Sequence, residues 1–144
     1  MKAKATLFLL VLTLICLTSC AVSLKNYKPA NPEEASIIST LMGFEKSYNS
    51  GDQKAVLDLF ADDARITTGD PRNKKVVTKE EYGRILPERF KAVGNLWISD
   101  PKIRIEGNIA TVKTTVGSKF GEVPNYIFKL KKHGDKWLIL ATEY

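Results

Sequence analysis

The sequence predicts a single α+β domain in which helices come first and an antiparallel sheet follows. The length of 144 residues suits one domain of ordinary size. Up to about residue 94 apolar residues recur at helical intervals, and from Asn95 onward they alternate with polar ones, as in strands. Hydrophobic residues make up 44% and charged residues 26%, which excludes a disordered, collagen-like or coiled-coil chain. We therefore expect the helices to pack against one face of the sheet.

The N-terminus has the layout of an export signal. Lys2 and Lys4 precede an uncharged, mostly apolar run over residues 5–17, which is shorter than the 20 or so residues of a membrane-spanning helix. The next residues, Leu17-Thr18-Ser19-Cys20, resemble the lipobox of bacterial lipoproteins. The resemblance implies that residues 1–19 are a lipoprotein signal peptide and that Cys20 carries fatty acyl chains such as palmitate.

A lipid on Cys20 would make the membrane the first partner of the chain and the bacterial cell envelope its location. Position 21 is Ala rather than Asp, which in a Gram-negative host implies the outer membrane, facing the periplasm. Cys16 would leave with the signal peptide and Cys20 would be consumed by lipid. Cysteine catalysis, cysteine metal sites and disulfides are thereby excluded.

The positive charge lies in the second half of the chain. Without residues 1–19 the formal net charge falls from +6 to 20 − 16 = +4. Residues 20–70 hold five basic and eight acidic side chains, whereas residues 71–144 hold fifteen and eight. An exported protein has little occasion to meet nucleic acid, so we expect no nucleic-acid partner and interpret this charge as a solvated, lysine-rich sheet face.

We expect residues 20–31 to be a lipidated tether and residues 32–144 to be the domain. The tether has no apolar periodicity, and its eleven residues from Ala21 could span roughly 35–40 Å when extended. Asn31 as N-cap, followed by Pro32 and Glu34, predicts a helix start. Asn49-Ser50-Gly51 predicts its end. The apolar stripe of this first helix consists of Ile37, Leu41, Phe44 and Tyr48.

A second, short helix is predicted after Asp52, which would cap it, with Asp62-Asp63 ending the pattern. Its buried side would consist of Ala55, Val56, Leu59 and Phe60. Residues 65–68 then alternate as a short strand with Ile66 and Thr68 on one face. We expect residues 69–75 to be a polar loop.

Thr78-Lys79-Glu80-Glu81 is a capping box that predicts a third helix. Pro87 lies inside it and predicts either a kink or a division into two short helices. The residues expected to face inward are Tyr82, Ile85, Leu86, Phe90 and Val93.

Four strands are predicted over residues 96–105, 109–116, 125–132 and 136–144, with turns at residues 106–108 and 133–135. Pro101 cannot donate to a sheet ladder, so the first of these strands should be bulged or lie at an edge. In the third strand Tyr126, Phe128 and Leu130 share one face, while Lys129 and Lys131 share the other.

Two segments resemble the nuclear transport factor 2-like superfamily, which includes ketosteroid isomerases and small polyketide cyclases of the SnoaL-like type. The first runs from Tyr48-Asn49-Ser50-Gly51-Asp52 to Phe60-Ala61-Asp62-Asp63-Ala64, and the second is the closing Gly134-Asp135-Lys136-Trp137. The resemblance implies a cone in which three helices and a curved antiparallel sheet enclose a pocket. It also implies a homodimer formed through the sheet.

The same resemblance argues against isomerase chemistry. The position of the isomerase's proton-abstracting carboxylate falls on Thr68, and the position of its tyrosine oxyanion donor falls on Phe44. Neither side chain can perform that role, so no catalytic residue is assigned. The single histidine, His133, lies in a predicted hairpin turn, so we expect neither a metal site nor a cofactor.

The sequence favours a lipid-anchored envelope protein whose domain binds a small apolar ligand or an envelope partner without catalysis. An isomerase, cyclase or hydrolase that uses Asp70, Glu143 or Tyr126 is the alternative from the enzyme class. A dimerisation or interaction module with a filled core is a third hypothesis. The residues expected to line a pocket are Phe44, Tyr48, Ile66, Thr68, Tyr126 and Phe128.

Overall fold

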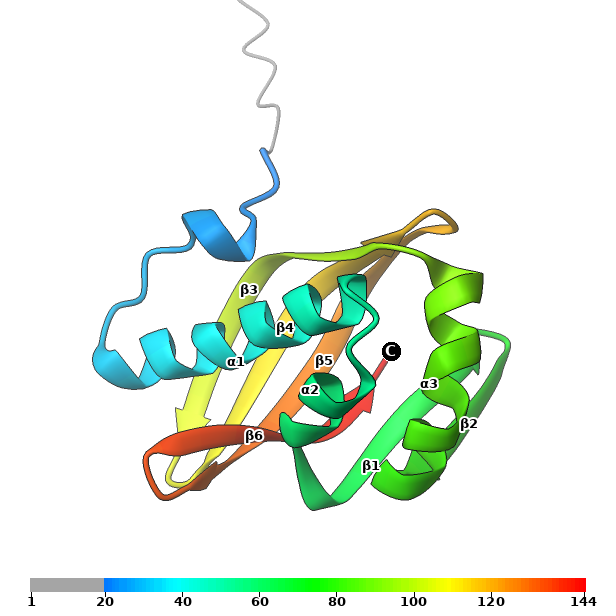
Figure 1. The fold of residues 1–144 in the computed structure, drawn as a ribbon. Helices are drawn as coiled ribbons and strands as arrows, with labels where there is room; N and C mark the ends of the chain where they lie inside the picture. Colours follow the sequence, from blue (N-terminus) through cyan, green and yellow to red (C-terminus); the bar gives the residue numbers. More distant parts are fainter. Residues whose placement is uncertain (1–19) are drawn as a thin grey trace, which may run out of the picture.

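The computed structural model describes residues 20–144, in which three α-helices lie on one face of a six-stranded sheet (Figure 1). The signal peptide predicted for residues 1–19 lies outside the described residues. None of the helices in the described part combines the length and apolar character needed to cross a membrane. The elements in chain order are η1 (Leu24–Asn26), α1 (Pro32–Asn49), α2 (Gln53–Asp58), β1 (Phe60–Asp70), β2 (Asn73–Thr78), α3 (Lys79–Val93), β3 (Leu96–Glu106), β4 (Ile109–Ser118), β5 (Gly121–His133) and β6 (Lys136–Glu143).

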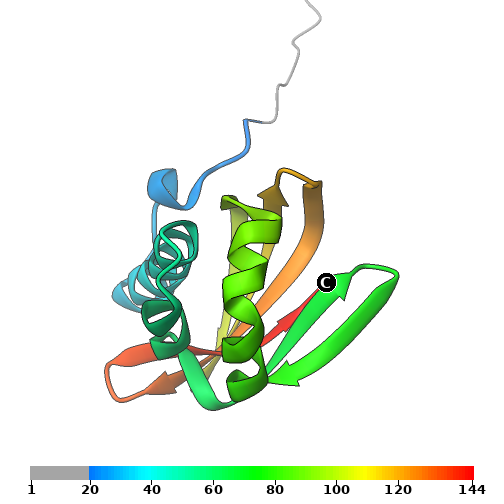
Figure 2. The ribbon, with the colours of Figure 1, turned by 45° about the vertical axis from the view of Figure 1, so that its right-hand side comes forward.

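The sheet has the strand order β2-β1-β6-β5-β4-β3 and is curved and open (Figures 1 and 2). Every neighbouring pair is antiparallel except β1 and β6, which run parallel. The fold is thus the predicted α+β type with a curved sheet, which is antiparallel except at this one pair. A parallel pair needs a long crossover, and here everything between β1 and β6 supplies it.

The first helix forms as the sequence predicts. The side-chain oxygen of Asn31 accepts a hydrogen bond from the Glu34 N–H at 2.9 Å, and Pro32 occupies the first helical turn. The predicted apolar stripe is buried in full. Helix α1 therefore lies with one face on the sheet, as Figure 1 shows.

The second helix is shorter than predicted, and the strand that follows it is longer. Asp52 caps α2 by accepting from the Ala55 N–H at 2.9 Å, but Phe60 already opens β1. Asp62 and Asp63 are exposed residues within this strand rather than the end of a helix. They lie in the bulged stretch of β1 between Phe60, which pairs with Ile139 of β6, and Arg65, which pairs with Ala141.

The predicted polar loop at residues 69–75 is instead a hairpin turn followed by strand β2. Strand β2 pairs with β1 alone and forms one edge of the sheet. Its lysines, Lys74 and Lys75, are exposed, a composition that protects edge strands from pairing with another chain. That same composition made the segment resemble a loop in the sequence.

Helix α3 begins with the predicted capping box. The Glu81 N–H donates to the Thr78 hydroxyl at 3.2 Å, and the Thr78 N–H donates to the Glu81 carboxylate at 2.7 Å. Tyr82 and Leu86 are buried as expected, and Phe90 and Val93 are half-buried, but Ile85 is exposed. The inward stripe is therefore rotated relative to the prediction.

Pro87 does not divide α3, which is continuous from Lys79 to Val93. Proline cannot donate to the carbonyl four residues earlier, that of Gly83. The side-chain amide of Gln53, from α2, donates to this carbonyl at 2.8 Å instead. The neighbouring helix thus satisfies the group that the proline leaves free.

The four C-terminal strands form where the alternation predicts them, each within a few residues of the expected bounds. Both expectations for Pro101 are confirmed: β3 is an edge strand, and its pairing with β4 shifts register between Ser99 and Lys102. Asp100, just before the proline, has a φ of 54°. The bulge therefore lies at the residue before the proline, where the ladder is broken.

Residues 22–27 are packed on the domain, which corrects the expectation of an extended tether. The Val22 N–H donates to the Asp100 carboxylate at 2.7 Å, and the Asp100 N–H donates to the Val22 carbonyl at 2.8 Å. Ser23 bridges Ser99 on β3, and Leu24 is buried in the core. A single buried leucine gives no periodicity, so the sequence carried no sign of this contact.

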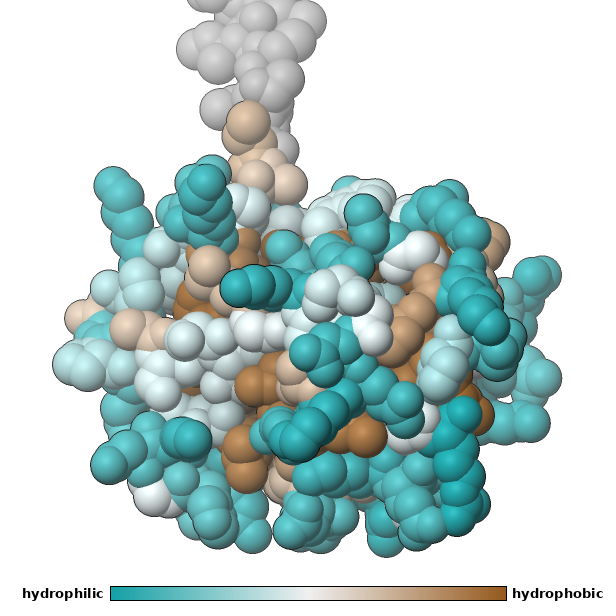
Figure 3. Space-filling model, viewed as in Figure 1, coloured by the Kyte–Doolittle hydropathy of each residue, from teal (hydrophilic) through white to brown (hydrophobic). Residues whose placement is uncertain are grey.

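The core lies between the helices and the sheet and is rich in aromatic side chains. Phe60, which was expected to be buried, and Trp137 are each 1% exposed. Figure 3 shows the opposite character outside, where hydrophilic side chains cover most of the helical face and brown atoms occupy narrow seams between them. The aromatic core matters for function because one end of it is hollow.

Candidate functional site

A cavity of about 410 Å³ lies between α3, α1 and the helix-covered face of the sheet. This volume is in the range of about 300–1,000 Å³ that is typical of small-ligand pockets. The walls are mainly apolar and come from segments far apart in the chain. The lining residues used below are Phe44, Tyr48, Asp70, Tyr82, Arg89, Val93, Val123, Tyr126, Phe128 and Tyr144.

Four of the six pocket residues expected from the sequence lie on these walls: Phe44, Tyr48, Tyr126 and Phe128. The other two, Ile66 and Thr68, do not line the cavity and are only 2% and 5% exposed. Helix α3 packs over β1, the strand that holds both residues. The structure thus places them in the filled part of the core and not on the cavity wall.

The aromatic wall is a connected set of rings. The ring of Phe44 meets that of Phe128 nearly edge-on, with centroids 5.8 Å apart and planes at 67°. Tyr126 packs against Phe128 at 4.9 Å and stacks on Tyr144 at 5.2 Å with an interplanar angle of 19°. Such contacts hold the rings in place, and the wall presents an apolar surface of fixed shape.

Arg89 is the polar feature of the cavity that sequence reasoning missed. It comes from the third turn of α3 and lines the cavity beside several tyrosines. Its Nε–H is buried and has no hydrogen-bond partner, and the guanidinium takes part in no ion pair within residues 20–144. The hydroxyl of Tyr48 is likewise buried without a partner.

The tyrosines around Arg89 stay protonated at physiological pH. Burial raises the pKa of Tyr126 to about 12 and raises the pKa of Tyr82 well above its ordinary value. Burial also raises the pKa of Tyr48 and Tyr144, although the nearby positive charge of Arg89 opposes the rise. Each of these hydroxyls is therefore a neutral group that can donate a hydrogen bond.

The structure separates the three residues of the catalytic alternative. Asp70 lies at the cavity wall, but its carboxylate accepts from the backbone N–H of Arg72 at 2.8 Å and from Nε of that arginine at 3.2 Å. These contacts lower the pKa of Asp70 below its usual value. Glu143 does not line the cavity and pairs with Lys129 at 2.8 Å. Tyr126 lines the cavity as a neutral phenol.

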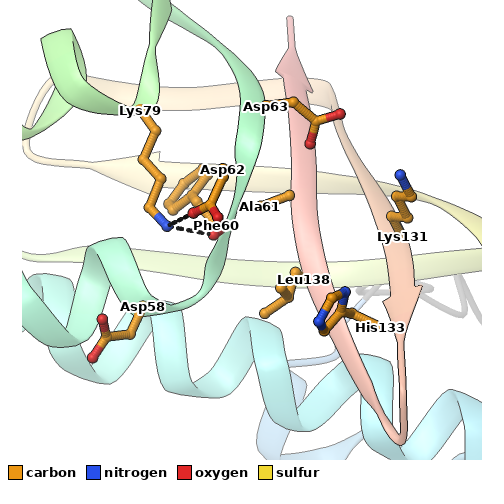
Figure 4. A pocket seen from close by; sticks show the side chains of 9 residues that line it. All are labelled: Asp58, Phe60, Ala61, Asp62, Asp63, Lys79, Lys131, His133 and Leu138. Carbon is orange, nitrogen blue, oxygen red and sulfur yellow. Dashed lines mark hydrogen bonds and ion pairs between the residues drawn. The ribbon is translucent and has the colours of Figure 1, made fainter.

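A second hollow of about 360 Å³ lies at the other end of β1 (Figure 4). There the Lys79 ammonium donates to the Phe60 carbonyl and to the Asp62 carboxylate, both at 2.9 Å. This partner lowers the pKa of Asp62, whose side chain is fully exposed. His133 sits at the hairpin, and the described residues contain no group of ligands that could hold a metal ion. We interpret this hollow as a solvated polar groove.

Comparison with known proteins yields structural matches only. No protein-family model matches the sequence, and no curated protein matches it. The fold is similar to that of a nuclear transport factor 2-like protein of unknown function from Shewanella baltica, with 17% identity, a TM-score of 0.63, and coverage of 81% of this chain and 94% of that one. A nuclear transport factor 2-like protein from Cytophaga hutchinsonii has 20% identity and a TM-score of 0.62 over 78% of this chain and 95% of that one.

A ketosteroid isomerase-like protein from Erwinia carotovora has 22% identity and a TM-score of 0.58, over 78% of this chain and 94% of that one. At these identities the likeness shows the fold alone. The chain therefore has the nuclear transport factor 2-like fold that its sequence motifs imply, with helices packed on a curved, mainly antiparallel sheet. Its function has to be argued from the cavity.

Proposed function

We propose that this chain is a lipid-anchored envelope protein whose single domain binds a small, mainly apolar ligand without catalysing a reaction. The aromatic cavity carries the proposal. It has the volume of a small-ligand site, its walls include Phe44 and Phe128, and its rings are fixed by contacts with one another. An apolar body entering it would leave water and contact surfaces that need little rearrangement.

The acid–base groups around the cavity favour binding over catalysis. A general base works best when its pKa is close to the working pH. Asp70 has a lowered pKa and is engaged by Arg72, whereas Tyr126 has a pKa of about 12. The isomerase positions, Thr68 and Phe44, hold a covered hydroxyl and a hydrocarbon ring.

A neutral dye tests the binding proposal. N-phenyl-1-naphthylamine is uncharged and fluoresces in apolar surroundings, so the mature chain, produced without signal peptide and lipid, should increase its emission saturably. Phe44→Trp should change the affinity because it changes the wall. Tryptophan there can also disturb the core, so Val123→Trp, at a half-buried wall position, provides a second variant.

Val76→Trp is the matched control, because Val76 is 64% exposed on β2 and does not line the cavity. We expect dye binding like wild type in this variant and weakened binding in Val123→Trp. If the wild-type chain does not bind the dye, or if all three variants bind it like wild type, the cavity is not the binding site.

The lipid anchor of the proposal rests on the Leu17-Thr18-Ser19-Cys20 motif. Because the chain is already bound to β3 at Val22, the free link after Cys20 consists of Ala21 alone. The two backbone steps from Cys20 to Val22 span only about 7 Å when extended. A lipid on Cys20 would therefore hold this edge of the sheet close to the membrane, rather than 35–40 Å away.

A further inference from the structure

The guanidinium of Arg89 lines the cavity without an ion-pair partner among the described residues. A guanidinium remains protonated at any physiological pH, and moving it out of water costs free energy unless an anion faces it. The Arg89 side chain is half-buried, and its Nε–H is buried without a hydrogen-bond partner. It forms no ion pair with the described residues. The cavity thus contains one cation without its counter-charge.

None of the lining residues forms an ion pair with Arg89. Asp70 is the single side-chain carboxylate among them, and two hydrogen bonds direct it to Arg72. The Asp70 side chain is 54% exposed, so it lies at the rim of the cavity. Among residues 20–144, therefore, no carboxylate is paired with Arg89.

Neutral donors surround the cation. The Tyr48 hydroxyl is buried without a hydrogen-bond partner, and Tyr82 and Tyr126 lie close enough to Arg89 to feel its charge. All three are protonated, so each can donate. A guanidinium flanked by phenolic O–H groups offers several hydrogen-bond donors at one place, and this is what an anionic oxygen needs.

We infer that the ligand is an organic acid whose carboxylate binds Arg89 and the Tyr48 hydroxyl, while its apolar body lies against Phe44 and Phe128. This inference rests on the proposed function, because it names the ligand class of the same cavity. A carboxylate fits better than a phosphate. Only one cationic side chain lines the cavity, and its single charge matches that of a carboxylate, whereas a phosphate carries more negative charge.

The test compares an acid with its uncharged amide of nearly the same size. 2-Naphthaleneacetic acid and 2-naphthaleneacetamide are each used to displace N-phenyl-1-naphthylamine, and direct calorimetric titration measures both affinities independently of the dye. Decanoic acid and decanamide repeat the comparison with a flexible body. The acid of each pair should bind the wild-type chain at least about tenfold more tightly than the amide.

Arg89→Met keeps an unbranched apolar stem and removes the charge. In this variant the affinity for the acid should fall to within about twofold of the affinity for the amide. Arg84→Met is the matched control, because Arg84 lies on the same helix, is exposed and pairs with Glu80. Its preference for the acid should equal that of wild type. Arg89→Lys, which keeps the charge but not the fork, should retain an intermediate preference.

The outcomes separate this inference from the proposed function. If the dye and the amides bind but the acids gain nothing, the ligand class is wrong and the apolar binding site stands. A preference that survives in Arg89→Met also overturns the inference, because another group then recognises the carboxylate. If neither the dye nor either pair of compounds binds the wild-type chain, the proposed function itself is wrong.

Discussion

Truncation of Phe60 to alanine is the sharpest test of the packing described above. Phe60 opens β1, is 1% exposed, and meets the ring of Phe44 from α1 edge-on at 5.8 Å and the ring of Tyr82 from α3 at 5.5 Å. One side chain thus joins both long helices to the sheet. Trp137 on β6, also 1% exposed, provides an independent position in the same core.

The expected cost follows from the surface that is lost. A phenylalanine side chain buries about 150–250 Å², and at about 25 cal/mol per Å² its complete removal from the core costs about 4–6 kcal/mol. Alanine retains part of that contact, so the truncation should lower the free energy of unfolding by about 3–5 kcal/mol, as for other large aromatic residues. The total free energy of unfolding of a small domain is about 5–15 kcal/mol, so this loss would be a large part of it.

Urea denaturation followed by circular dichroism measures this loss as a shift of the midpoint. Phe120→Ala is the matched control, because Phe120 is 75% exposed and its truncation should change stability by less than about 0.5 kcal/mol. Phe60→Leu, with a smaller loss, keeps the test usable if the alanine variant does not fold. Midpoints for Phe60→Ala and Trp137→Ala that match the Phe120→Ala midpoint would refute the packing.

Three further predictions concern processing, capping and chemistry. Cys20→Ser should leave an unacylated precursor in the host, whereas Cys16→Ser should be processed normally; incorporation of labelled fatty acid into Cys20→Ser would refute the lipoprotein assignment. Thr78→Ala should lower stability by about 1 kcal/mol in denaturant titrations. The hydrogen bond from the Thr78 N–H lowers the pKa of Glu81 in the folded state. The stabilisation that this carboxylate gives the folded state should therefore be complete above its ordinary pKa of about 4.3 and be lost as the pH falls through its lowered pKa. The purified chain should not isomerise a 3-ketosteroid above the buffer rate, and turnover abolished by Asp70→Asn would support the enzyme alternative.

The parts of the fold that could be predicted are those with strong local signals. Asn31 and Thr78 start helices because their side chains accept from backbone N–H groups three residues on, which depends on neighbouring residues alone. Strand β2 and the docked residues 22–27 depend on distant partners instead, β1 and Asp100 of β3. Their own residues are polar or lack periodicity, so no local pattern distinguished them from loops.

The cavity was predictable only from residues that already belonged to an apolar pattern. Phe44 and Tyr48 lie four residues apart on one helix face, and Tyr126 and Phe128 alternate on one strand face. Tyr144 reaches the cavity because β6 ends beside the turn of β1, where its hydroxyl donates to the Gly69 carbonyl at 2.7 Å. That position is set by the parallel pairing of β1 with β6, which the sequence did not indicate.

Arg89 shows why a charged ligand site is hard to read from hydrophobic periodicity. At 100° per residue it lies about 20° from Tyr82 around α3, whereas Ile85 lies about 60° away. Selection of apolar residues placed Ile85 in the buried stripe, but helix geometry places Arg89 nearer its centre, and the structure leaves Ile85 exposed. A cation at the centre of an inward stripe costs free energy in the empty protein. Since an uncharged side chain such as methionine would fill that position at lower cost, the arginine there is best explained by the acidic ligand that it would bind.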